Sequence, residues 1–238
     1  MNSKRSISVL YLIIILIIGC NKEPVPDGSE GTITYEGQAY TYKTFGKQTW
    51  MTENLAYLPE VSPPTVSSHS ERHYYVYGYE GTSVNAATAT LYYATYGVLY
   101  NWEAALTACP PGWHLPSDAE WEKLTDYLIN NGFGYGGTGG DIGKSMASTT
   151  GWARSSVTGE VGNDQTTNNS SGFNVVPAGQ QSFLEGFIGL GNYASFWTSN
   201  MKGGLSAWAR DLYSDNTEGL YADYWSRSYG FSVRCLKN

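Results

Sequence analysis

The hydrophobic pattern between residues 100 and 132 predicts two helices joined by a proline turn. One face of the first helix collects residues spaced i, i+3, i+4 and i+7, namely Trp102, Ala105, Leu106 and Cys109. Residues 110–112 (PPG) cannot continue a helix, so the first helix ends at the cysteine. The second helix begins at a capping box of Ser117 and Glu120. It buries a stripe formed by Trp121, Leu124 and Leu128, and residues 130–132 (NNG) end it.

Alternating apolar and polar residues predict strands on both sides of this helical pair. Before the helices, the expected strands are residues 32–35, 38–45, 48–51 and 72–79. After the helices, the expected strands are residues 173–176, 187–190, 194–197, 206–212 and 230–235. Residues 132–143 and 152–171 predict loops, and residues 81–96 favour neither a helix nor a strand.

The N-terminus has the pattern of an export signal. Lys4 and Arg5 precede an apolar run at residues 9–18, which is short for a membrane span and has the proportions of a signal peptide. Residues 17–20 (IIGC) resemble the bacterial lipobox, in which the cysteine is diacylated and becomes the mature N-terminus. The alternative is an uncleaved anchor helix with an incidental cysteine.

We therefore predict three segments. Residues 1–19 are a lipoprotein signal peptide, residues 20–30 a polar tether, and residues 31–238 one domain. A lipid on Cys20 would hold the protein to the membrane, at the bacterial outer membrane or the cell surface. In either interpretation of the leader, the rest of the chain leaves the cytoplasm.

Charge limits the classes of partner. Without residues 1–19 the chain keeps 12 basic and 21 acidic residues, a net charge of −9. This charge argues against nucleic acid or an anionic membrane surface as a partner. With Cys20 lipidated, Cys109 and Cys235 remain in an oxidising compartment, and one disulfide between them is the economical interpretation.

The composition is rich in aromatic residues, with 20 Tyr and 8 Trp beside 15% charged residues. Aromatic rings suit carbohydrate recognition because their flat faces stack on sugars. Most of these rings must nevertheless belong to the core, so no single ring identifies a ligand site.

Motifs for chemistry are weak. Gly134, Gly136 and Gly139 match a bare dinucleotide pattern, but they follow a helix rather than a strand, so we reject a nucleotide site. Residues 139–145, which end in Lys144 and Ser145, are one residue short of the phosphate-binding loop pattern and lack the strand before it, so we reject this site as well. No hydrolase elbow, zinc motif or paired-cysteine motif is present in the sequence. We expect no enzyme activity, no metal and no cofactor.

Six segments carry a family resemblance. In order along the chain they are residues 47–55 (KQTWMTENL), 96–102 (YGVLYNW), 109–117 (CPPGWHLPS), 171–179 (SGFNVVPAG), 196–199 (FWTS) and 230–235 (GFSVRC). They resemble the landmarks of the Fibrobacter succinogenes major paralogous domain, over roughly residues 32–238. This resemblance implies a branch of the C-type-lectin-like fold, in which a disulfide ties the first helix to the last strand, here Cys109 to Cys235. It also implies a secreted or outer-membrane lipoprotein, and it brings no settled activity.

Two further likenesses bear on function. Residues 115–122 (LPSDAEWE) are similar to a segment of formylglycine-generating enzymes, whose oxidase chemistry needs a reactive cysteine pair toward the C-terminus. Here that region holds Cys235 alone, so the chemistry should be absent. The calcium-binding motifs of carbohydrate-binding C-type lectins are missing from the sequence, which argues against calcium-dependent sugar binding.

We expect an α+β, C-type-lectin-like fold with two central helices packed on short antiparallel sheets with long loops. The expected function is a non-catalytic surface binding module for a glycan or a protein partner. The alternatives are an enzyme of the formylglycine-generating lineage with altered chemistry, or a purely structural or adhesion protein.

The expected ligand site is a cluster near the C-terminus that the family landmarks do not explain, consisting of Tyr221, Asp223, Tyr224 and Trp225. These residues would form an exposed stacking platform. The competing interpretation is an edge strand, with Tyr221 and Asp223 on one face and Tyr224 on the other.

Overall fold

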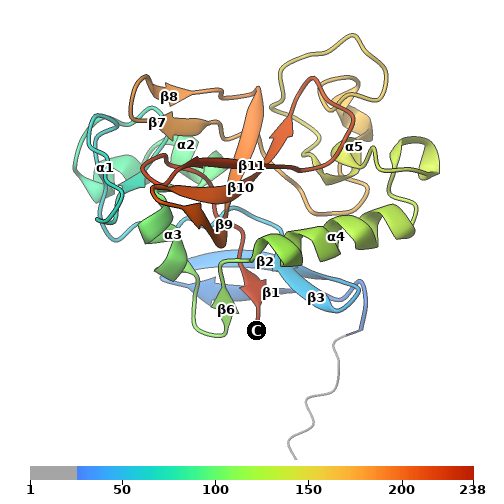
Figure 1. Ribbon diagram of the computed structural model, residues 1–238, viewed down its shortest axis with the longest axis horizontal. Coiled ribbons are helices and arrows are strands. Elements are labelled where there is room, and N and C mark those ends of the chain that lie inside the picture. The colour runs from blue at the N-terminus through green and yellow to red at the C-terminus, as the bar shows by residue number, and fades with distance from the viewer. Residues whose placement is uncertain (1–25) are drawn as a thin grey trace, which may run out of the picture.

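The computed structural model describes residues 26–238, which form a mixed α+β domain (Figure 1). The predicted signal peptide and Cys20 lie outside the described residues. Between residues 26 and 238, no helix has the length and apolar character that crossing a membrane requires.

A five-stranded antiparallel sheet joins the two ends of the domain. Its strand order is β1-β2-β3-β12-β6, with bounds β1 Glu30–Tyr35, β2 Gln38–Phe45, β3 Gln48–Met51, β12 Leu236–Lys237 and β6 Trp113–His114. Strands β2 and β3 have the predicted bounds, because Gly46 at φ 62° makes the tight turn between them. Strand β12 lies between β3 and β6, so the last strand of the domain pairs within the same sheet as its first three strands.

A second sheet of three antiparallel strands lies on the other side of the molecule (Figure 1). Its order is β11-β10-β9, with bounds β9 Tyr193–Gly203, β10 Ser206–Tyr213 and β11 Tyr221–Ser226. Two short pairs complete the strands, β4 Tyr74–Tyr75 with β5 Leu99–Tyr100, and β7 Gln180–Ser182 with β8 Gly186–Ile188.

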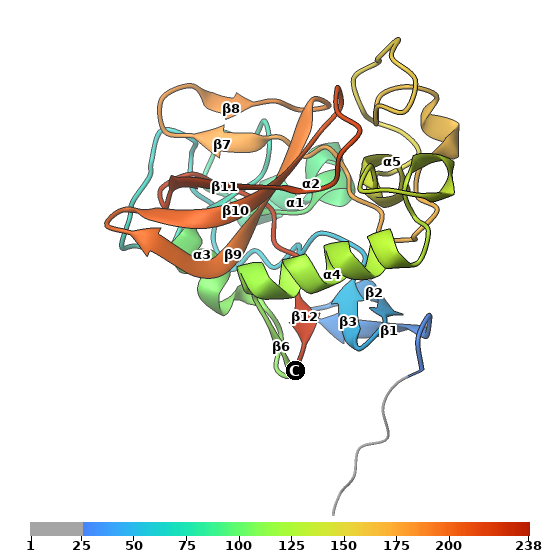
Figure 2. The ribbon, with the colours of Figure 1, turned by 45° about the vertical axis from the view of Figure 1, so that its right-hand side comes forward.

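Helix α4, Asp118–Asn130, separates the two large sheets, as both views show (Figure 2). Its predicted features are confirmed. The Ser117 amide and hydroxyl each donate to Glu120 Oε2 at 2.7 Å. The buried stripe is Trp121, Leu124 and Leu128, and the Trp121 ring contacts an aromatic group formed by Trp50, Phe173 and Phe196.

The buried face predicted for helix α3, Trp102–Ala108, is confirmed at Trp102, Ala105 and Cys109 but is wrong at Leu106. Leu106 is 38% exposed, whereas Ala104 and Ala108 are buried together with Trp102 and Ala105. The alanines allow the helix to approach the core closely, so the small side chains, not the leucine, face inward. Asn101 caps this helix by accepting from the Ala104 amide at 3.2 Å.

The remaining helices are short. The segment 81–96 forms α1 Val84–Thr88 and α2 Leu91–Tyr96, each capped by a hydroxyl side chain. The predicted loops contain two 3₁₀ turns, η1 Tyr135–Gly137 and η2 Gln165–Thr167, and α5 Gly143–Met146 begins where the first of these loops ends.

Four predicted strands are wrong or shortened. Within residues 187–190 only Phe187 and Ile188 belong to a strand, β8. Only Tyr74–Tyr75 is a strand within residues 72–79. Residues 173–176 form no regular strand, because Arg234 takes the carbonyls of Phe173 and Asn174 that a partner strand would use. Residues 230–232 make isolated bridges to three separate segments, at Tyr100, Gln181 and Phe196, so residues 230–235 cross the core instead of pairing along one neighbour.

The disulfide between Cys109 and Cys235 is present, as predicted. It joins the end of α3 to the segment before β12. The predicted tether at residues 20–30 ends too late. Glu30 already belongs to β1, and Asp27 accepts from the Tyr127 hydroxyl at 2.8 Å and from the Gly46 amide at 2.8 Å. The domain therefore includes residues 27–30.

Candidate functional site

A pocket of about 290 Å³ lies between the β7–β8 hairpin and the β9–β11 sheet. This is the small end of the range for small-molecule sites. Four aromatic rings line it, those of Tyr193, Tyr213, Trp225 and Tyr229. Between them lie the buried side chains of Gln180, Ser182 and Ser195, with Glu185 and Ile188 from the hairpin. We call this cavity the aromatic pocket.

The strand register brings these side chains together. Tyr213 on β10 is opposite Tyr193 on β9, and Asp211 is opposite Ser195. Because alternate residues of a strand point to the same face, Asp211 and Tyr213 project toward the pocket side of the sheet with Tyr193 and Ser195. The Tyr193 and Tyr213 ring centroids are 5.9 Å apart.

Asp211 lies directly behind the pocket wall and is 1% exposed. Its Oδ2 accepts from Trp225 Nε1 at 3.1 Å, while its Oδ1 has no hydrogen-bond partner among the described residues. Burial raises the pKa of Asp211 to about 6; the Ser195 hydroxyl and the Trp225 indole oppose this shift, and the Asp223 charge adds a smaller rise. Asp211 is thus a buried carboxylate with one free acceptor.

The phenols of the pocket share this acidic surrounding. Burial, followed by the charges of Asp211 and Asp223, raises the pKa of Tyr213 to about 12. Burial is also the largest cause that raises the pKa of Tyr193, with contributions from Asp211 and Glu185. Both hydroxyls therefore stay protonated at neutral pH and are available as hydrogen-bond donors.

The hairpin that roofs the pocket is fixed in place by Gln181. Its Nε2 donates to the Pro64 carbonyl at 2.8 Å, and its backbone bridges to Gly230. The pocket is therefore formed by folded elements on both sides, which favours a preorganised site.

The predicted site residues divide between the two faces of β11. In the register with β10, Asp223 is opposite Ala209 and Trp225 opposite Ala207, so both lie on the side of Asp211. Tyr224 is opposite Trp208 on the other face, where Lys202 stands 4.2 Å from the Trp208 ring centroid. The edge-strand interpretation is therefore the correct description of this segment, and no single platform unites the four residues.

Of the predicted cluster, Trp225 lines the aromatic pocket. Tyr221 contacts Tyr213 with ring centroids 6.0 Å apart and borders a separate open cavity beside Leu220. Sequence reasoning missed Tyr193, Ser195, Asp211 and Tyr213. The signal that could have found Asp211 is an acidic residue in phase with Ala207 and Ala209, the small apolar residues on one face of the strand at residues 206–212.

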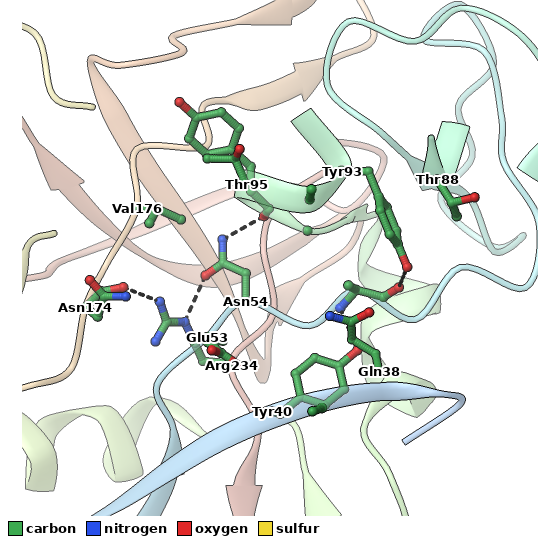
Figure 3. Close-up of a pocket in the computed structure, with 15 residues that line it drawn as sticks. Gln38, Tyr40, Glu53, Asn54, Thr88, Tyr93, Thr95, Asn174, Val176 and Arg234 are labelled. Carbon is green, nitrogen blue, oxygen red and sulfur yellow. Dashed lines mark hydrogen bonds between the residues drawn. The ribbon is translucent and has the colours of Figure 1, made fainter. Parts of the chain in front are cut away.

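A second cavity, of about 510 Å³, lies where α2 meets the β2–β3 region (Figure 3). Arg234 and Asn54 form its floor, and the guanidinium donates to Asn54 Oδ1 at 2.8 Å and to the Asn174 carbonyl at 2.7 Å. The Tyr93 hydroxyl donates to the Ala56 carbonyl at 2.8 Å. The polar groups of Arg234, Asn54 and Tyr93 are thus paired within the protein, and this cavity has fewer aromatic rings in its lining than the aromatic pocket.

Arg234 is a fully buried cation with no carboxylate at ion-pair distance among the described residues. Burial lowers its pKa to about 9, so it is still charged at neutral pH. Carbonyl oxygens and the faces of Phe173 and Phe196 surround the guanidinium, at 5.1 and 5.6 Å from the ring centroids. These contacts indicate that Arg234 has a structural role in the core.

Other candidates from the sequence have structural roles. Lys144 is buried and donates to the carbonyls of Glu160, Asn163 and Asp164, so it fastens the loop after Trp152 rather than cradling a phosphate. Within residues 26–238, no group of three or more His, Cys, Asp or Glu side chains could hold a metal.

The chain matches the family model of the Fibrobacter succinogenes major domain over residues 44–237. The chain belongs to this family. The family segment begins inside β2 and contains every residue that lines the aromatic pocket, so the pocket is part of the family domain rather than of an appended segment. No curated protein and no solved structure matches the chain.

Proposed function

We propose that the domain is a non-catalytic binding module that recognises a glycan through the aromatic pocket. The observation that carries the proposal is the combination of four ring side chains with buried hydroxyl and amide groups in one small cavity. A sugar ring has apolar C–H faces that pack on aromatic rings and hydroxyls that need donors and acceptors. The pocket supplies both kinds of contact.

Asp211 favours a second candidate, an enzyme. A buried carboxylate with a raised pKa near a pocket is a known property of catalytic acids. Asp211, however, is shielded by Ser195 and Trp225 and does not line the cavity. A catalytic acid must come within hydrogen-bond reach of the reacting atom, so we favour binding over catalysis.

The setting of this module is the cell envelope. The basic residues, apolar run and lipobox at residues 1–20 support lipid attachment at Cys20. We expect Cys20→Ala to abolish metabolic labelling of the protein with a fatty acid. Unchanged labelling would contradict the anchor.

For the fold, we favour a C-type-lectin-like architecture. The support is the disulfide from the end of the first central helix to the segment before the last strand, together with the two helices of the landmark region. In such a fold the ligand would be held by the region between the central helices and the last strands, which includes the aromatic pocket.

A glycan array probed with the full-length protein in detergent tests the binding function. A wild-type hit should be weakened by Tyr193→Ala by at least about tenfold, the value of one stacked ring by analogy with base stacking. Ile188→Trp should give a similar loss by filling the cavity without removing a ring. Tyr224→Ala is the matched control, because Tyr224 is 54% exposed on the opposite face of β11.

Melting temperatures of the same variants separate binding from folding. The proposal fails if no glycan binds, or if Tyr224→Ala weakens a bound glycan as much as Tyr193→Ala does. It also fails if both pocket variants remain folded and bind normally.

A further inference from the structure

The aromatic pocket is surrounded by acidic groups. Glu185 lines it from the hairpin, Asp211 lies behind its wall, and Asp223 lies on the same face of the sheet as Asp211. Besides burial and neighbouring tyrosines, carboxylates raise the pKa of the two tyrosine phenols: Asp211 and Glu185 act on Tyr193, and Asp211, Asp223 and Asp215 act on Tyr213.

No cation balances these carboxylates within residues 26–238. The ion pairs of this part of the chain use other carboxylates, namely Glu30, Asp118, Glu120, Glu122 and Glu103. Lys202 stands over the opposite face of the sheet, against Trp208, and Arg227 is paired with Glu103 at 2.9 Å. None of the ion pairs of the described residues therefore involves the carboxylates around the pocket, of which Asp211 is buried and Glu185, Asp215 and Asp223 are exposed.

Asp211 also has an unused acceptor. Its Oδ1 is buried and has no hydrogen-bond partner among the described residues, while its side chain points to the pocket side of the sheet. A buried carboxylate oxygen without a partner is costly, and a positive ligand charge nearby would lower that cost. The surrounding rings act in the same direction, because the faces of aromatic rings are negative and attract cations.

We infer that the sugar held in the aromatic pocket carries a protonated amine, as in a non-acetylated amino sugar; this rests on the proposed glycan-binding function. The sugar's apolar face packs on the rings, and its ammonium group lies toward Glu185 and the wall in front of Asp211. An acetylated amino sugar lacks the charge and gains nothing from these carboxylates. The pocket thus selects by charge among sugars of similar shape.

The test compares two soluble probes at neutral pH, oligomers of glucosamine and oligomers of N-acetylglucosamine, by titration calorimetry on the full-length protein in detergent. We expect the wild type to prefer the amine-bearing oligomer by at least about tenfold. Glu185→Gln should remove most of that preference and change the affinity for the acetylated oligomer by less than about twofold. Asp211→Asn should act in the same direction, since it keeps the side-chain volume and an acceptor for Trp225.

Glu36→Gln is the matched control, because it removes one negative charge at the exposed turn between β1 and β2, in the other large sheet. A general attraction of the acidic protein for cations would respond to Glu36→Gln as it does to Glu185→Gln, and that result would overturn the inference. Equal binding of both oligomers would overturn the inference and leave the glycan function standing. Binding of no glycan at all would remove the proposed function as well.

Discussion

At the scale of single residues, Arg234 connects segments that are far apart in the chain. Its guanidinium donates to Asn54 Oδ1 and to the carbonyls of Phe173 and Asn174. The carbonyls of Phe173 and Asn174 are not paired with a neighbouring strand, so Arg234 is the side chain that hydrogen-bonds to them. Unpaired buried carbonyls cost more than their hydrogen bonds contribute.

Arg234→Lys should therefore destabilise the domain although it keeps the charge. A lysine ammonium is a point charge and cannot span the three acceptors as the planar guanidinium does. We expect a loss of about 2–4 kcal/mol in the free energy of unfolding, measured by urea denaturation. Arg154→Lys, at an exposed position, should change it by less than about 0.5 kcal/mol. Equal, small effects at both positions would contradict the role of Arg234.

Asp211 makes stability depend on pH. Its pKa in the folded protein is about 6, above the ordinary value of 3.8. The unfolded chain therefore ionises this carboxyl first as pH rises, and the folded state is progressively disfavoured from about pH 4 to about pH 6. Two pKa units correspond to about 3 kcal/mol, fully expressed above pH 6 and absent below pH 4.

Asp211→Asn should remove this penalty. The stability of the variant relative to wild type should rise between pH 4 and pH 7 by an amount on the order of 3 kcal/mol. Urea denaturation at the two pH values measures it. A stability difference that is the same at both would show that Asp211 ionisation is not coupled to folding.

At the scale of elements, α4 is the helix whose packing the sequence predicts best. Its capping box and stripe are local features, and the stripe meets both sheets. The Trp121 ring contacts Trp50 with centroids 4.5 Å apart, yet its Nε1 has no hydrogen-bond partner among the described residues. The Trp121 ring therefore stabilises the fold through its packing and not through a hydrogen bond of its indole nitrogen.

Trp121→Ala should cost roughly 3–5 kcal/mol in the free energy of unfolding, because it leaves a large cavity. Trp121→Phe should cost clearly less, since it keeps most of the ring and removes an unpaired donor. Leu106→Ala on α3 is the control for the helix faces, and its partial exposure predicts a change of less than about 1 kcal/mol. Thermal unfolding of the three variants measures these values. A large loss in Leu106→Ala would mean that α3 buries the face first predicted from the sequence.

At the scale of the whole molecule, the disulfide closes a large covalent loop. Cys109 and Cys235 are separated by 126 residues. In the chain-entropy model such a loop contributes on the order of 4–5 kcal/mol by restricting the unfolded chain. The paired variant Cys109→Ala with Cys235→Ala should lose a stability of this order in urea denaturation. Mass spectrometry of a non-reducing digest should find the two peptides linked, and two free thiols in exported protein would contradict the bond.

The sequence by itself determined the local features of this protein. Glycine at a left-handed position set the hairpin between β2 and β3, and the Ser117–Glu120 box set the start of α4. The family landmarks and the cysteine pair also follow from the chain alone. Each of these features depends on residues close in sequence or on a small number of candidates, so few alternatives compete.

The tertiary structure alone decided which face each element buries and what covers it. The period of a strand shows that Asp211 and Tyr213 share a face, but not that the β7–β8 hairpin lies over that face. In the same way Leu106 fits a helical stripe, yet alanines allow the closer approach of α3. The aromatic pocket combines residues 180–195, 213 and 225–229, and this meeting depends on long-range packing that no local pattern contains.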